Sequence, residues 1–200
     1  MTIDLTGITN ENEFYTHHYL SAILENDLKD LFKEWSRRQK EENIPTPASL
    51  LGGLARDFFR MRSNLAEERD PTARQSLQSV FLEKLLSALG YPFHPQLQEG
   101  DDGQFIPIAG EICKGSGAPE LWIMPVLDGV GQDEVDPLEL CPPSDLCDDQ
   151  NEPQELADTT WQSLLTKSVF SREEPPRWVI LAGTWQVLLI DRAKWAQKRL

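Results

Sequence analysis

The sequence predicts an α+β fold, in which an N-terminal helical layer precedes a small, mainly antiparallel or mixed sheet with a central hairpin. Apolar residues recur at helical spacing through the first 90 positions, and the period changes to short strand-like runs from Tyr91. At 200 residues and 40% hydrophobic content, the chain is long enough to bury a good-sized core. We therefore expect one compact domain with a helical part over 1–90 and an α/β part over 91–200.

The central hairpin is predicted from residues 177–192, RWVILAGTWQVLLIDR. Two apolar runs flank Gly183-Thr184, and a glycine between two such runs is typical of a tight turn that needs a positive φ. Both runs are apolar at nearly every position, which is typical of strands covered on both faces. We expect this hairpin to lie in the middle of the domain.

Three amphipathic helices are predicted before it. The first carries a stripe with spacings of four, four, three and four, and the second runs from about Ala48 to Glu68. The third begins at Asp70-Pro71, an N-cap followed by a first-turn proline, and ends at Gly90. The stripe of the first helix consists of Leu20, Leu24, Leu28, Leu31 and Trp35.

Two strands are predicted next, Phe105–Lys114 and Glu120–Leu127, joined by a turn at 115–117. Their short connections favour antiparallel pairing. A helix is expected to resume near Leu156. A last helix, capped by Asp191, runs into Leu200 with no stop signal, so we expect the sequence to be a fragment of a larger protein.

The chain is acidic, with a net charge of −14, and no Lys or Arg occurs from 115 through 166. Proline and carboxylates crowd the acidic loop, residues 128–155, and predict a long solvated insertion. The net charge argues against a free-standing nucleic-acid binder but leaves a local basic face open. The sequence has neither an export signal nor a membrane span, and three cysteines without a tight pair favour a reduced, cytoplasmic protein.

No metal or phosphate motif is convincing. Neighbouring His17 and His18 would point about 100° apart on a helix, and the cysteines lack zinc-site spacing. The string GEICKGSG at 110–117 lacks the Lys-Ser/Thr of a phosphate loop and precedes a strand, so it predicts a turn. We expect neither a metal site nor a cofactor in this chain.

Several carboxylates of the predicted strands raise the question of an active nuclease. Nucleases of the PD-(D/E)xK type place an Asp and a Glu-x-Lys on adjacent strands, where the carboxylates hold Mg²⁺. Glu111 and Lys114 are one residue too far apart, and alternation would point them to opposite faces of a strand. An active nuclease is therefore disfavoured, while an inactive domain of the same shape stays open. The carboxylates of this arrangement belong to Asp101, Asp102, Glu111, Glu120 and Asp128, and its lysine is Lys114.

Four stretches together resemble the N-terminal region of large bacterial adenine-specific DNA methyltransferases of the type IIG restriction-modification kind, including those of phage-defence islands. They are Asn10–Trp35, Asp70–Gly90, Ala118–Asp128 and Pro175–Trp195. The resemblance implies a restriction-nuclease-like fold, intact in some members and degenerate in others. This chain has neither the Asn-Pro-Pro-aromatic motif that grips a flipped adenine nor a Gly-rich methyl-donor turn.

The resemblance implies that this chain is a non-catalytic accessory domain that supports DNA engagement or subunit coupling. The parent protein would carry the methyltransferase domain, use S-adenosylmethionine, contact DNA and work with other defence-system subunits. One alternative is an acidic interaction module that mimics DNA through the acidic loop, and another is an active Mg²⁺-dependent nuclease. The basic positions we expect to reach DNA are Arg37, Arg38, Lys40, Arg56, Arg60 and Arg62.

Overall fold

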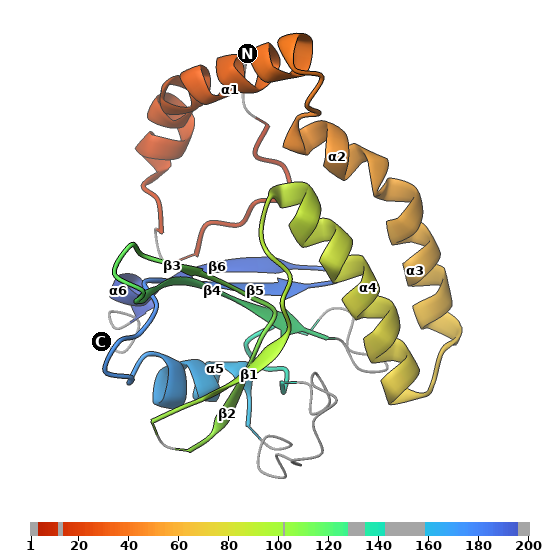
Figure 1. Cartoon of the computed structure of the whole chain (residues 1–200), viewed down its shortest axis with the longest axis vertical. Helices are drawn as coiled ribbons and strands as arrows, with labels where there is room; N and C mark the ends of the chain where they lie inside the picture. Colours follow the sequence, from red (N-terminus) through yellow and green to blue (C-terminus); the bar gives the residue numbers. More distant parts are fainter. Residues whose placement is uncertain (1–3, 12–13, 102, 128–134, 143–158, 196–200) are drawn as a thin grey trace.

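The computed structural model describes residues 4–11, 14–101, 103–127, 135–142 and 159–195. It confirms the α+β class, with most helices preceding the sheets (Figure 1). The N-terminal helical part comprises η2 (Tyr19–Ile23), α1 (Leu24–Glu41), α2 (Pro47–Gly53), α3 (Ala55–Glu67) and α4 (Pro71–Leu89). The rest comprises β1 (Gln96–Glu99), β2 (Phe105–Ile108), β3 (Gly110–Cys113), β4 (Pro119–Val126), α5 (Trp161–Leu164), η3 (Leu165–Val169), β5 (Trp178–Gly183), β6 (Val187–Asp191) and α6 (Arg192–Trp195).

The predicted end signals of α4 are confirmed. The Asp70 carboxylate accepts the Ala73 N–H at 2.8 Å, and Pro71 occupies the first helical position. Gly90 ends the helix with a φ of 81°, a left-handed conformation that glycine adopts without strain. The single helix predicted over Ala48–Glu68 is wrong, because the chain breaks after Gly53 into α2 and α3. Gly52 and Gly53 have a low helix propensity, and they offer no side chain that could pack there.

The strands form a two-stranded sheet, β1-β2, and a four-stranded sheet in the order β3-β4-β5-β6. The predicted strand Phe105–Lys114 is divided at Ala109, where the chain leaves its pairing with β1 and begins to pair with β4. β3 and β6 run antiparallel to their neighbours, whereas β4 and β5 are parallel. The sheet is therefore mixed, because the long connection that includes α5 returns the chain in the same direction.

The β5–β6 hairpin forms as predicted, but two expectations about it are wrong. β5 is an interior strand, whereas β6 lies at the edge and leaves Val187 54% and Leu189 46% exposed. Gly183 does not have a positive φ. It is instead a position of close approach, because a Cβ there would lie 3.0 Å from the Gln186 carbonyl oxygen.

The hairpin ends at Asp191, which joins β6 to α6. Its carboxylate accepts the Arg177 Nε–H at 2.9 Å and the Ala193 N–H at 2.9 Å, which confirms the predicted cap. The predicted extension of this helix beyond Trp195 lies outside the described residues.

Two apolar clusters sandwich the four-stranded sheet. On one face, Leu82 and Leu86 of α4 pack against Leu121, Ile123 and Ile180 of the sheet. The other face meets α5 and η3 through the largest buried cluster, and a third cluster joins α3 to α4. The largest cluster includes Ile106, Ile108, Trp122, Met124, Val126, Trp161, Leu164, Leu165, Val169, Val179 and Leu181. No helix in the described ranges is both long and apolar enough to cross a bilayer.

Candidate functional site

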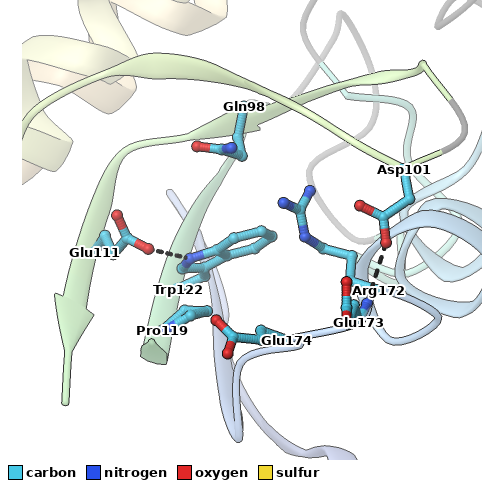
Figure 2. Close-up of a pocket in the computed structure, with 8 residues that line it drawn as sticks. All are labelled: Gln98, Asp101, Glu111, Pro119, Trp122, Arg172, Glu173 and Glu174. Carbon is cyan, nitrogen blue, oxygen red and sulfur yellow. Dashed lines mark hydrogen bonds between the residues drawn. The ribbon is translucent and has the colours of Figure 1, made fainter. Parts of the chain in front are cut away.

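A pocket of about 410 Å³ lies beside Trp122, a residue of the core cluster that joins the sheet to α5 and η3 (Figure 2). It draws residues from three regions: the β1–β2 hairpin, the β3–β4 pair, and the segment that follows η3. Its lining residues are Gln98, Asp101, Glu111, Pro119, Trp122, Arg172, Glu173 and Glu174.

Trp122 is the centre of this pocket. Figure 2 shows its ring between Glu111 on one side and Arg172 on the other. Glu111 and Trp122 are cross-strand partners, and the indole Nε1–H donates to the Glu111 carboxylate at 2.8 Å. The Arg172 guanidinium lies 5.2 Å from the Trp122 ring centroid, within cation–π range. Because Trp122 is 2% exposed, the ring is packed into the core and serves as the pocket's rigid wall.

Two backbone contacts hold the remaining side of the pocket. Arg172 Nη1 donates to the Glu99 carbonyl oxygen at 2.8 Å, and the Glu173 N–H donates to the Asp101 carboxylate at 3.1 Å. These bonds join the segment after η3 to the β1–β2 hairpin, across more than 70 positions of sequence. The pocket therefore exists only because this segment returns to the hairpin.

The electrostatics of the pocket disfavour phosphate. Four carboxylates, from Asp101, Glu111, Glu173 and Glu174, line it with a single guanidinium. A nearby thiol is also unsuited to nucleophilic chemistry, because burial and the charge of Glu111 raise the pKa of Cys113. Thiolate is the nucleophilic form, so a raised pKa lowers its population at neutral pH.

The geometry bears directly on the carboxylates and the lysine for which an active nuclease is disfavoured. Glu111 and Trp122 share one face, and alternation along β4 places Glu120 on that face too. A Glu-x-Lys motif would put lysine at the position that Trp122 occupies. The Glu120 carboxylate forms an ion pair with Lys114 Nζ at 3.0 Å, because a register shift between Ile112 and Cys113 alters the alternation of β3.

Strand alternation predicts that Glu111 and Lys114 point to opposite faces, and the ion pair between Lys114 and Glu120 revises this expectation. Both of these side chains contact residues of β4. Within the described part of the chain, no group of three His, Cys, Asp or Glu residues is arranged to hold a metal ion. The candidates Asp102 and Asp128 lie outside the described residues.

The predicted basic positions fall on two helices with different surroundings. On α1, Arg37 bonds to Glu34 and Glu41 at 2.8 Å, and Arg38 lies 3.6 Å from Glu42. Lys40 is exposed near the end of the same helix. On α3, three exposed arginines form no ion pair with any described residue. They are Arg56, Arg60 and Arg62.

Most of the acidic loop, 128–134 and 143–158, lies outside the described residues. The part from 135 to 142 is not the solvated insertion that we expected. Leu138 and Leu140 are buried in the largest core cluster, and the Leu140 carbonyl accepts the Trp161 N–H at 2.8 Å. Two leucines among acidic residues were the available signal for this packing.

Sequence reasoning missed the roles of Trp122 and Arg172. Because Trp122 follows Glu120 by two residues, alternation along a strand could have placed it where a Glu-x-Lys motif has its lysine. Nothing local in the sequence could have paired Arg172 with it. No family model, curated protein or solved structure matches the chain.

Proposed function

We propose that this chain is a non-catalytic accessory domain of an adenine-specific DNA methyltransferase of the restriction-modification kind, and that it engages DNA through α3. The observation that carries this proposal is the surface formed by Arg56, Phe59, Arg60 and Arg62, called here the α3 face. The methyltransferase domain, its S-adenosylmethionine and any defence-system subunits belong to the parent protein that the sequence resembles.

The α3 face combines positive charge with an exposed aromatic ring. Phe59 is 63% exposed and lies three residues from both Arg56 and Arg62, so its ring neighbours each of these two arginines on the helix surface. The carboxylate of Asp57 is occupied by Lys84 Nζ at 2.6 Å. Arg56 and Arg60 therefore remain available to phosphate, whereas the Arg62 guanidinium lies 4.1 Å from the Trp185 ring centroid. Aromatic rings beside cations stack on bases or wedge between them.

The α1 arginines are weaker candidates than those of α3. Arg37 contacts three carboxylates, from Glu34, Glu41 and Glu42, at 2.8 to 2.9 Å. A phosphate would have to compete with these intrahelical pairs for the guanidinium. The difference separates two sets of basic residues that the sequence alone presents as equivalent.

The candidate site supports a non-catalytic role. From α4 to β5 the order is helix, four strands, helix and strand, and apolar clusters cover both faces of the four-stranded sheet. Glu111 is bound by an indole N–H where a nuclease would need a lysine nearby, and Glu120 is paired with Lys114. Both carboxylates are thus engaged by groups other than a metal ion.

The experiment is a titration of a fluorescent DNA duplex with the chain, across salt from about 50 to 200 mM. We expect weak, salt-dependent binding in the absence of Mg²⁺, and no cleavage when Mg²⁺ is added. The double variant Arg56→Gln/Arg60→Gln should weaken binding and reduce the slope of log K against log salt by about two, one unit for each lost phosphate contact.

The matched control is Arg37→Gln/Arg38→Gln, which removes the same charge from α1. It should leave the salt slope unchanged. Equal losses in the two double variants would contradict the assignment to α3, and would indicate a general effect of net charge. A chain that shows no DNA affinity at low salt would overturn the proposal and favour the acidic interaction module.

A further inference from the structure

Helix α1 carries an apolar stripe whose residues are half-buried or exposed, and none of them is fully buried. The stripe, called here the α1 seam, consists of Leu24, Leu28, Leu31 and Trp35. No residue of α1 is buried, and Leu31 is 43% exposed. The helix has 18 residues, about 27 Å of length, and Figure 1 shows it lying apart from the sheet. Such a long amphipathic helix gains most of its stability from burying its apolar face against other elements, and no residue of that face is fully buried here.

The spacing of the seam matches a two-helix interface. Its residues are separated by four, three and four positions, which is the alternation of a and d positions in a heptad. A seam of this kind fits the apolar stripe of one other helix better than it fits a broad sheet or a small ligand.

The charges beside the seam indicate the chemistry of that helix. At 100° per residue, Glu25 and Asp27 lie about 80° to either side of the seam centre. Lys29 and Lys33 lie on the opposite face, where Lys33 is paired with Asp30 at 2.8 Å. The N-terminal half of the seam is therefore flanked by carboxylates.

We propose that the α1 seam docks an amphipathic helix of a partner that carries Lys or Arg beside its own apolar stripe. Cations at these flanking positions set partner choice in paired helices. A second copy of this chain fits less well, because it offers the same carboxylates at the same positions. Lys29 and Lys33 lie on the opposite face, and Arg38 lies 3.6 Å from the carboxylate of Glu42, the residue that follows α1. The proposal is independent of DNA binding by α3.

The probe is a three-heptad synthetic peptide with Leu at a and d and Lys at e and g, because like charges there keep it from pairing with itself. The control peptide has Glu at e and g. We expect the Lys peptide to bind this chain in the micromolar range by calorimetry, since one helix pair buries little area. The Glu peptide should bind at least about tenfold more weakly.

Variants locate the binding. Leu31→Asp should weaken binding of the Lys peptide by at least about tenfold, because it places a charge in the apolar seam. Val80→Asp is the matched control, since Val80 is 54% exposed on α4 and the change adds the same charge. The two variants therefore have the same net charge and should attract the Lys peptide equally through it. Any difference in their affinity must come from the change in the α1 seam. Neither substitution removes a buried contact, and circular dichroism would check that both variants fold.

A charge exchange tests the chemistry of the partner. Glu25→Lys/Asp27→Lys should reverse the preference, so that the Glu peptide binds more tightly than the Lys peptide. Equal binding of both peptides to the unmodified chain, or equal binding of the Lys peptide to both Asp variants, would overturn the proposal. So would a dimer in sedimentation velocity that Leu31→Asp dissociates, since the seam would then be occupied by a second copy.

Discussion

The hydrogen bond between Trp122 and Glu111 offers the sharpest test of the candidate site. Trp122→Phe keeps an aromatic ring in the core but removes the indole N–H that donates to Glu111 at 2.8 Å. Because Glu111 is only half-buried, water can replace part of the lost bond. The expected effect is a moderate loss of stability without loss of the fold.

The magnitude follows from two contributions. Hydrogen bonds to charged groups contribute about 1.5 to 3 kcal/mol, and solvent access to Glu111 reduces this to about 1 kcal/mol. The smaller ring leaves unfilled space beside fully buried neighbours such as Met124, which costs about 1 kcal/mol more. The sum of about 2 kcal/mol corresponds to a fall in Tm of about 4 to 8 °C for a domain of this size.

The assay is urea unfolding of a double-mutant cycle that combines Trp122→Phe with Glu111→Ala. We expect a coupling energy of about 1 kcal/mol between the two positions. Glu111→Gln retains an acceptor oxygen, so its coupling to Trp122→Phe should be smaller. A coupling energy below about 0.3 kcal/mol would refute the view that the indole holds this carboxylate.

Three further predictions concern the framework. Asp70→Ala should lower the free energy of unfolding by about 1 kcal/mol in urea, because an N–H in the first turn of α4 loses its cap. Gly110→Ala should destabilise the protein by at least about 2 kcal/mol, because its Cβ would clash with the Pro92 carbonyl oxygen, whereas Gly115→Ala meets nothing within 4 Å and should be tolerated. Burial opposes ionisation of Asp191, yet its arginine partner and a backbone N–H hold the pKa of its carboxyl below the ordinary value. Asp191 therefore stabilises the fold above about pH 4 and loses this effect as the pH falls further, so Asp191→Asn should flatten the fall in Tm between pH 5 and pH 3.

The helices show which features of secondary structure a local sequence pattern can predict. Asp70, Pro71 and Gly90 bound α4 because capping depends on residues within one turn of the helix end. The break between α2 and α3 was missed because apolar spacing continues through it while Gly52 and Gly53 interrupt the helix. Periodicity therefore predicts which face of a helix is apolar better than it predicts where the helix ends.

The strands show a different limit. The apolar runs predicted β4, β5 and β6, but β6 lies at the edge and leaves Val187 exposed. An apolar run cannot distinguish an edge strand from an interior one, since that depends on how many neighbours the strand acquires. β1 was missed because four residues with only one apolar side chain carry no strand signal.

The sequence by itself determined the α+β class, the capped helix α4, the hairpin and the amphipathic character of α1, because each depends on residues close together in the chain. Only the tertiary structure decided that β4 and β5 pair in parallel, that Trp122 and Arg172 meet in one pocket, and that the α3 arginines differ from those of α1. These features require contacts between segments up to about 70 positions apart, or side-chain pairing that periodicity does not encode. Such contacts are selected by the packing of the whole core, so no local pattern specifies them.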